Sequence, residues 1–282
     1  MEGPHLELLD FYRTCAPFYD RDYAGMYEEG VQLYVELARE SGGPVLEMGC
    51  GTGRVLLPTA RAGIAVCGME LSPDMLDVAR RSAAAEPEEV QRRVKLVPGD
   101  IRCDSAGSRF PLITAPFRVA QHLLERADQR AWLRNVKWHL FPGGFLCFDV
   151  FQVDPGRLAE EGKALMTIDR IEPETGCRVR RFDTLHSFPA LQLIGVHVEW
   201  VEESASGERV SATAADCTMR WFTRAELENL LELEGFEITD YWGSFDRRPF
   251  GHGAQQQIIR ARLSDRASAR RQPSRDRKRA AA

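Results

Sequence analysis

The sequence lacks the features that would place the protein in a membrane, on a secretory route or on a nucleic acid. No apolar run approaches the ~20 residues that a membrane-spanning helix requires. Residues 1–30 are acidic and aromatic, unlike a signal peptide. Basic residues are not in excess, because 37 Lys and Arg against 42 Asp and Glu give a formal net charge of -5. This balance argues against nucleic acid or an anionic membrane as the main partner.

Paired cysteines are also lacking. The chain has 7 cysteines, an odd number, and their positions are scattered along it: Cys15, Cys50, Cys67, Cys103, Cys147, Cys177 and Cys217. A disulfide framework or a zinc site would show closer pairing in the sequence. We therefore expect reduced thiols, a cytoplasmic protein and no bound metal.

What the chain does have is enough apolar material for a full core. It has 282 residues, 44% of them hydrophobic, which favours one domain with an embellishment over two independent domains. The predicted organisation is a helical cap over 1–40, a main domain over 41–263 with an insert at about 165–222, and a disordered basic tail over 264–282.

The first half of the main domain alternates short apolar runs with helical stretches. The expected strands are Val45–Met48, Ile64–Met69, Val94–Val97, Pro111–Ala115 and Phe145–Val150. The expected helices between them are Arg54–Arg61, Asp74–Ala84 and Gln129–Leu140. Ser72 before Pro73 is a good helix start, since the serine oxygen can cap the helix and proline needs no N–H there. This alternation predicts an α/β fold with a doubly wound parallel sheet.

After residue 151 the pattern changes to that of antiparallel strands. Apolar residues alternate over 177–222, most clearly at Ile194, Val196, Val198 and Trp200, which predicts strands with one buried face. Thr223 then opens a helix that closes at Gly235. Two further strands are expected, at Phe236–Tyr241 and Gln257–Arg262.

A glycine-rich turn follows the first predicted strand and raises the question of its ligand. Gly49, Gly51 and Gly53 stand at every second position before a helical stretch. The backbone N–H groups of such a turn favour an anion, and a dinucleotide is the first candidate. Arg54 stands where the dinucleotide pattern requires a small residue. Glu47, just ahead of the glycines, would repel a pyrophosphate and suits a ligand with ammonium and sulfonium charge.

Acidic residues stand at the ends of three successive predicted strands. Glu70 ends the second strand, where a carboxylate can accept bonds from both ribose hydroxyls. Asp100 follows the third strand and is placed to accept from an adenine amino group, with Leu71 and Ile101 flanking the ring. Together with Glu47, these acids come in the order that a single S-adenosylmethionine molecule requires.

The motifs resemble those of class I S-adenosylmethionine-dependent methyltransferases, in particular bacterial small-molecule enzymes with a β-insert. The matching stretches are VLEMGCGTGRVLLPTARAG, VCGMELSPDMLDVAR, VKLVPGDIR, TAPFRVAQHL and LFPGGFLCFDVF. The resemblance implies a Rossmann-like seven-stranded sheet whose last strand is antiparallel. It also implies that the β-insert covers the acceptor as a lid and that the N-terminal segment closes over the methionine end.

The resemblance assigns roles by position. Glu47, Gly49 and Gly51 would line the methionine moiety, Glu70 would bind the ribose and Asp100 the adenine. The backbone at Ala115 and Pro116 would pass beside the sulfur, and Tyr19 is expected to be a lid residue over the methionine.

The acceptor side is less well specified. His122 lies just after the fourth strand, where an open α/β sheet places its ligand crevice, and is our candidate base. A histidine satisfied by backbone groups is the equal alternative. Arg118 and Gln121 are candidates to orient a polar acceptor. We thus expect a methyltransferase acting on oxygen or nitrogen of a small molecule, monomeric or homodimeric.

Three other functions stay open. The basic tail SARRQPSRDRKR suits an RNA or tRNA methyltransferase, although the Asn/Asp-Pro-Pro-aromatic motif of base-methylating enzymes is replaced by Thr114-Ala115-Pro116-Phe117. An NAD-dependent oxidoreductase is disfavoured by Glu47 and Arg54. A non-catalytic S-adenosylmethionine-binding protein would carry the same cofactor motifs.

Overall fold

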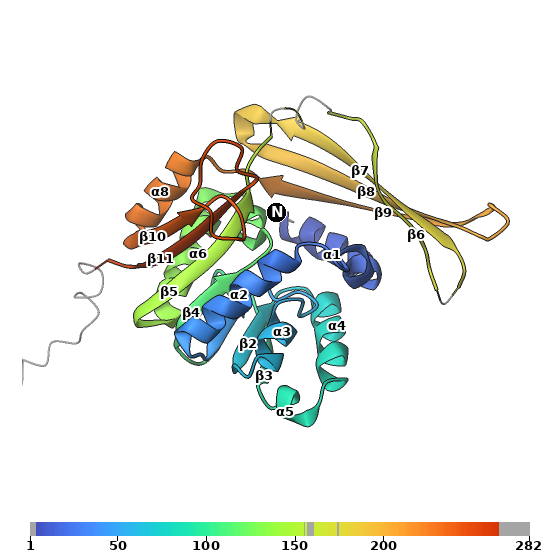
Figure 1. Cartoon of the computed structure of the whole chain (residues 1–282). Coiled ribbons are helices and arrows are strands. Elements are labelled where there is room, and N and C mark those ends of the chain that lie inside the picture. Colours follow the sequence, from blue (N-terminus) through green and yellow to red (C-terminus); the bar gives the residue numbers. More distant parts are fainter. Residues whose placement is uncertain (1–3, 155, 157–160, 174, 265–282) are drawn as a thin grey trace, which may run out of the picture.

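The structure, a computed structural model, describes residues 4–154, 156, 161–173 and 175–264. It contains two sheets and the helices that cover them (Figure 1). Residues 265–282 of the tail predicted over 264–282 lie outside the described residues, and the limits of the predicted domains stay predictions. None of the described helices has both the length and the apolar character needed to cross a membrane.

The larger sheet has seven strands in the order β10-β11-β5-β4-β1-β2-β3. Strands β1 to β5 pair in parallel, and β11 runs antiparallel between β5 and β10. This confirms the predicted doubly wound sheet with its last strand antiparallel. Its strands are β1 (Val45–Met48), β2 (Val66–Glu70), β3 (Val94–Pro98), β4 (Phe110–Ala115), β5 (Leu140–Phe151), β10 (Phe236–Trp242) and β11 (Gln256–Leu263).

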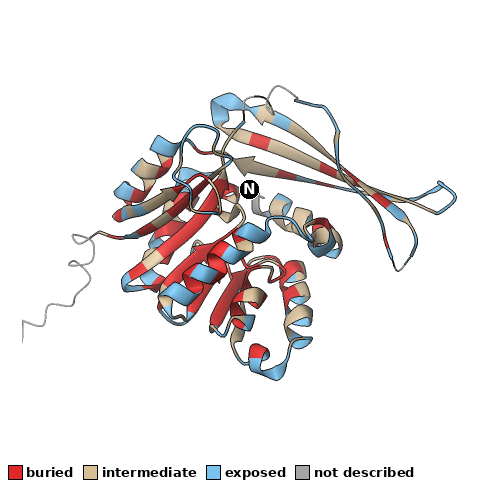
Figure 2. Ribbon diagram, viewed as in Figure 1, coloured by how far each residue is buried: buried red, intermediate tan, exposed pale blue. Residues whose placement is uncertain are grey.

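Helices cover both faces of this sheet. On one face, apolar residues of α6 (Arg126–His139) and α8 (Arg224–Leu233) pack in a core with Leu46 and Ile113. On the other face, α2 (Glu28–Ser41) and α3 (Leu56–Arg61) pack with Val45 and Leu112. Burial is concentrated in the strands between these two layers (Figure 2). The remaining elements of this part are α4 (Pro73–Ala84), α5 (Glu88–Gln91) and the short 3-10 helix η1 (Val119–His122).

Two predicted helix starts are confirmed by their capping bonds. The side chain of Ser72 accepts a hydrogen bond from the Met75 N–H at the start of α4. Thr223 accepts in the same way from the Glu226 N–H at the start of α8. The helix predicted from Arg54 begins two residues later, since Gly53 has a φ of 93° and the chain is still turning there.

The predicted β-insert is a separate four-stranded antiparallel sheet in the order β6-β7-β8-β9 (Figure 1). Val198 and Trp200 are buried on one face, as the alternation indicates. Its strands are β6 (Leu165–Ile171), β7 (Arg178–Phe188), β8 (Leu193–Glu203) and β9 (Arg209–Arg220), and a one-turn helix, η2 (Pro189–Leu191), joins β7 to β8.

Helix α1 (Pro4–Asp22) connects the insert to the larger sheet. Phe11, Cys15 and Phe18 lie one turn apart and pack against the insert, and the Phe18 ring stacks on Trp200 at 4.9 Å between ring centroids. Helix α1 also contacts α4 beside the larger sheet. A single helix therefore contacts both the insert and a helix that packs on the larger sheet.

A buried ionic network fixes the end of α1 to the insert. Asp22 accepts from Arg170 at 2.7 Å, from Arg181 at 3.1 Å and from the Trp200 ring N–H at 2.8 Å. The Asp22 carboxylate is almost fully buried. Because a buried charge is costly unless it is paired and hydrogen-bonded, this network orients α1 strongly relative to the insert.

Candidate active site

The predicted glycine turn joins β1 to α3, and its glycines are required by conformation and by space. Gly49, Gly51 and Gly53 have φ angles of 72°, 54° and 93°, in the left-handed region that favours glycine. A Cβ on Gly49 would lie 2.6 Å from a methyl of Val119. The turn therefore passes close to the segment after β4. A larger residue than glycine at position 49 would collide with that segment.

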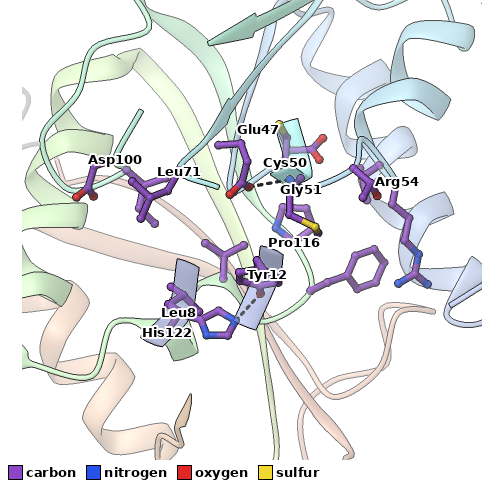
Figure 3. A pocket seen from close by; sticks show the side chains of 18 of the residues that line it. Leu8, Tyr12, Glu47, Cys50, Gly51, Arg54, Leu71, Asp100, Pro116 and His122 are labelled. Atoms are coloured by element: carbon purple, nitrogen blue, oxygen red, sulfur yellow. Dashed lines mark hydrogen bonds between the residues drawn. The ribbon is translucent and has the colours of Figure 1, made fainter. Parts of the chain in front are cut away.

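This turn forms one wall of a cavity of about 880 Å³, a volume that includes its open mouth. We call it the glycine-turn cavity. Ten residues that the sequence singled out line it: Tyr19, Glu47, Gly49, Gly51, Glu70, Leu71, Asp100, Ile101, Pro116 and His122. Asp100 and Leu71 lie at one end of the site and Arg54 at the other (Figure 3). Ala115 is fully buried and is not among the lining residues.

Glu47 is a buried carboxylate in this cavity. It accepts a backbone bond from Leu56, and burial raises its pKa well above the ordinary 4.5. Within the described part of the chain, no Lys, Arg or His lies within ion-pairing distance of Glu47. A buried acid without a cation is costly, so the site suits a ligand that brings positive charge.

Glu70 is held by the backbone of the loops around it. Its two carboxylate oxygens accept from the Gly51 N–H at 2.9 Å and from the Ser72 N–H at 2.8 Å. Burial raises the pKa of Glu70, while these N–H groups act in the opposite sense. The carboxylate thus joins the glycine turn to the start of α4 and has a fixed orientation at the cavity wall.

Asp100 is engaged by a neighbouring cation. Arg102 donates to both of its carboxylate oxygens at 3.0 Å and also pairs with Asp128 at 2.9 Å. The two carboxylates raise the pKa of Arg102 further above its ordinary range. Asp100 therefore enters the cavity as part of an ionic network, and its orientation is set by Arg102.

A second cavity, which we call the insert cavity, lies between the larger sheet and the β-insert. Its volume is about 1970 Å³ including its mouth, and Ile194, Val196 and Val198 of β8 line it. Arg118 lines this cavity as well. Five residues line both cavities and form their common wall: Tyr12, Tyr19, Arg54, Phe117 and His122.

His122 lies in this common wall, at the end of η1. Its Nε2 is 2.8 Å from the Tyr12 hydroxyl, and the two side chains point toward each other in Figure 3. Its Nδ1 is buried and has no hydrogen-bond partner among the described residues. Burial, with a smaller effect of the Arg118 cation, lowers the pKa of His122 to about 4. The ring is therefore neutral near pH 7.

The turn before η1 has a strained backbone. Phe117 and Arg118 have φ angles of 56° and 76°, and two consecutive non-glycine residues in this region are unusual. Asp149 Oδ1 accepts from the Phe117 N–H at 2.8 Å and from the Tyr34 hydroxyl at 2.5 Å. This buried carboxylate holds the turn that places Phe117 in the common wall and Arg118 in the insert cavity.

Gln121 lies near both cavities without lining either. Its amide nitrogen donates to the Arg220 carbonyl at 2.8 Å, and its amide oxygen accepts from the Phe151 N–H at 2.9 Å. The side chain is fully buried and both of its ends are used. Gln121 therefore supports the contact between η1, β5 and β9, and both ends of its amide are used by backbone groups.

Tyr12 and Asp149 are among the residues of the site that sequence reasoning missed. Tyr12 lies on α1 with Leu8 and Tyr19, which are one and two turns away and line the glycine-turn cavity. That helical spacing would have predicted Tyr12 on the same side of the helix as Tyr19. Asp149 gave no such signal, because an aspartate near the end of a strand has many possible partners.

Comparison with known proteins gives a match over the region of the glycine turn and the next strands. Residues 46–146 match a family model described as a methyltransferase domain. A cypemycin N-terminal methyltransferase from a Streptomyces species is 25% identical over 224 residues, which cover 77% of this chain and 82% of that protein. The dTDP-3-amino-3,6-dideoxy-alpha-D-glucopyranose N,N-dimethyltransferase of Streptomyces fradiae is 33% identical over 141 residues, and the chain spans about half (52%) of its length.

The fold is shared with solved structures. The CcbJ methyltransferase of Streptomyces caelestis superposes with a TM-score of 0.73 at 24% identity. The match covers 91% of this chain and 99% of that one, so it includes both the larger sheet and the insert.

Proposed function

We propose that this chain, which carries a class I S-adenosylmethionine-dependent methyltransferase domain, moves a methyl group to nitrogen or oxygen of a small molecule by in-line displacement. The observation that carries the proposal is the common wall of Tyr12, Tyr19, Arg54, Phe117 and His122. Two ligands bound on its opposite sides would meet there. The names of the two relatives, an N-terminal methyltransferase and an N,N-dimethyltransferase, favour nitrogen.

In this proposal the glycine-turn cavity holds the cofactor. S-adenosylmethionine, when bound, supplies a methyl carbon on a positively charged sulfur that is ready to leave. Glu47 offers its unpaired carboxylate to the ammonium end, and Gly49 and Gly51 leave room for the methionine chain. Glu70 faces the ribose, and Asp100 with Leu71 and Ile101 faces the adenine. Pro116 and the backbone at Ala115 lie toward the sulfur, and Tyr19 closes the methionine end.

The insert cavity holds the acceptor. Its apolar face from β8 suits an organic scaffold, and Arg118 supplies a polar contact. The chain contributes mainly by holding acceptor and methyl in line in a space from which water is excluded. No metal is needed for this step, because the leaving group is already activated.

His122 is the proposed proton acceptor for an acceptor that must lose a proton. It is neutral near pH 7 and its Nε2 lone pair accepts from the Tyr12 hydroxyl, so a proton leaving the methyl acceptor would reach the ring by way of that hydroxyl. With a pKa of about 4 it is a weak base, and its contribution is therefore smaller than that of alignment. Tyr12 fixes the ring through the bond to Nε2.

The proposal also covers the compartment and the partners of the protein. All seven cysteines are free thiols. We assign the reaction to the cytoplasm, on a monomer or homodimer acting on a small molecule, without nucleic acid or membrane as a partner.

Calorimetry with S-adenosylhomocysteine tests the cofactor half. We expect tight binding to the wild type and a loss of about a hundredfold or more in Glu70→Ala, which removes a buried carboxylate that also holds the Gly51 and Ser72 N–H groups. Glu88→Ala, an exposed acid on α5, is the matched control and should bind like the wild type. Absence of binding to the wild type would reject the proposal.

Incubation with labelled S-adenosylmethionine and a panel of amines and alcohols tests the transfer itself. Label in an acceptor supports the enzyme. Tight cofactor binding with no label transferred across a broad panel would favour a non-catalytic binding protein.

A further inference from the structure

Two arginines line the insert cavity without a carboxylate partner. Arg54 and Arg118 form no ion pair with any acidic residue that the structure describes, whereas Arg181 of the same cavity pairs with Asp22 and Asp183. Arg118 is only partly exposed. A partly buried guanidinium without a counter-charge is unfavourable unless a ligand supplies one.

Aromatic rings fix the positions of both guanidinium groups. Arg54 lies 4.4 Å from the Phe117 ring centroid and 5.7 Å from that of Tyr27. Arg118 lies 5.6 Å from the same Tyr27 ring and 5.5 Å from Phe151. The two cations thus contact one tyrosine ring. Cation–π contacts use the faces of the guanidinium and leave its N–H edges available.

Few of those N–H groups have a partner in the part of the chain that the structure describes. Arg54 donates to the Met26 carbonyl, and Arg118 donates to the Tyr27 hydroxyl at 3.3 Å. Each guanidinium has five N–H donors. Most of this donor capacity is therefore free to bind a group in the cavity.

The strained turn places Arg118 in the insert cavity. Its φ of 76° and that of Phe117 before it are maintained by Asp149, a buried anchor. A backbone held in an unfavourable conformation by surrounding contacts is typical of a functional position. The strain and the unpaired charge are independent observations, and both concern Arg118.

The acidic residues of the cavity are mostly engaged elsewhere. Asp22 and Asp183 are paired with Arg181, and Asp149 accepts from Tyr34 and the Phe117 N–H, while the Arg118 charge acts on it without an ion-pairing contact. Asp154 is exposed and accepts from the Gly156 N–H. Among the described residues, no carboxylate therefore forms an ion pair with the two arginines around Tyr27.

We propose that Arg54 and Arg118 form an anion-binding site and that the methyl acceptor carries a negatively charged group, a phosphate or a carboxylate. The assignment rests on the proposed function, because it treats the insert cavity as the acceptor site. The two guanidiniums bind the anionic group beside Tyr27, and the rest of the acceptor extends along the apolar face of β8 toward the common wall.

The test uses two probes with the same aromatic body, measured by fluorescence on protein saturated with S-adenosylhomocysteine. Anilinonaphthalene sulfonate carries an anionic group and phenylnaphthylamine carries none. We expect Arg118→Met to lower the affinity for the anionic probe by about tenfold or more, because that probe loses charge-assisted hydrogen bonds. The affinity for the neutral probe should stay unchanged. Arg54→Met should act in the same direction by a smaller factor, because Arg54 also lines the glycine-turn cavity, where S-adenosylhomocysteine brings its own carboxylate. Arg118→Lys should lie between wild type and Arg118→Met.

Arg80→Met is the control, because Arg80 pairs with Asp77 on exposed α4, away from both cavities. Unchanged binding of the neutral probe shows that the cavity of each variant is intact. An anionic probe that does not bind the wild type, or that binds Arg118→Met and wild type equally, overturns the proposal.

Competition then separates the two sources of the anion. Displacement of the sulfonate probe by pyrophosphate at lower concentration than by benzoate indicates a phosphate-bearing acceptor, and the reverse order indicates a carboxylate. Failure of both to displace it contradicts an anion site. These measurements do not depend on turnover, so they stay informative even if the methyl transfer proposal fails.

Discussion

The Tyr12 hydroxyl and Nε2 of His122 lie 2.8 Å apart although 110 residues separate them in the chain. Burial raises the pKa of Tyr12 and lowers that of His122, so both groups are neutral near pH 7. The neutral ring carries one N–H, and a phenol that donates to Nε2 leaves that N–H on Nδ1. The contact therefore joins helix α1 to the segment after β4, and its direction sets the tautomer of His122.

Tyr12→Phe removes this bond and leaves Nε2 buried without a partner. We expect the free energy of unfolding to fall by about 1 kcal/mol, the usual net effect of one hydrogen bond, and methyl transfer to slow by about tenfold because the ring loses its fixed orientation. Urea unfolding and initial rates measure the two effects. Nitrogen chemical shifts of labelled histidine should show the Nδ1–H form in the wild type and a mixture in the variant.

Tyr241→Phe is the control for Tyr12. It also removes a tyrosine hydroxyl bond, to Gln257, but on β10 and outside both cavities. It should lose stability without a matching loss of rate. Equal slowing of transfer in both variants would show that Tyr12 acts only through general stability.

Gly49→Ala tests the close approach of the glycine turn to Val119. Both Gly49 and Gly63 have a positive φ, 72° and 90°, but a Cβ on Gly63 would meet nothing within 4 Å. Each alanine should cost about 1–2 kcal/mol for the left-handed backbone, and Gly49→Ala should cost about 1–3 kcal/mol more for the clash. Chemical unfolding gives the difference. Equal losses in the two variants would mean that Val119 moves aside freely.

Asp22→Ala tests the network that joins α1 to the insert. The change leaves Arg170 with Glu172 alone and Arg181 with Asp183 alone, and it leaves the Trp200 ring N–H without an acceptor. We therefore expect a loss of about 3 kcal/mol in the free energy of unfolding, the lower end for a broken buried pair. Asp77→Ala removes one exposed partner of Arg80 and should change it by about 0.5 kcal/mol or less. A small effect at Asp22 would show that water replaces it.

Glu47→Gln should change how stability depends on pH. Because the folded-state pKa of Glu47 lies above the ordinary 4.5, its contribution to stability is complete below that value and is lost as pH rises through the folded pKa. The cofactor-free variant carries no ionisable group there, so its free energy of unfolding should rise relative to that of the wild type as pH increases across this interval, by about 1.4 kcal/mol per pH unit. Unfolding curves from about pH 4 to about pH 8 measure the difference.

The same variant should bind S-adenosylhomocysteine more weakly, since the ligand ammonium loses its carboxylate partner. Glu88→Gln, exposed on α5, is the control for both measurements. A stability difference between Glu47→Gln and wild type that is independent of pH would show that Glu47 does not titrate as a buried acid.

The sequence predicted the glycine-turn cavity well because its determinants are local. A strand, a turn and a helix start each have a pattern within a few residues, and parallel strands end at one edge of a sheet. Glu47, Glu70 and Asp100 therefore come together once the strands are placed. All three line the cavity.

The insert cavity could not be predicted in the same way. Its walls come from α1, η1, β5 and the insert, and their relative positions depend on long-range contacts such as Asp22 with Arg170. Gln121 shows the difficulty: its position after β4 resembles that of a ligand-facing residue, but two backbone groups from β5 and β9 use its amide. A satisfied buried amide and a ligand contact have the same appearance in a sequence.

The common wall also has a thermodynamic consequence. Five side chains that contact both cavities cannot be ordered by one ligand without being ordered for the other. The binding of the two ligands is therefore coupled, and by reciprocity each must change the other's affinity by the same factor. Measuring the acceptor affinity with and without S-adenosylhomocysteine would give that coupling free energy directly.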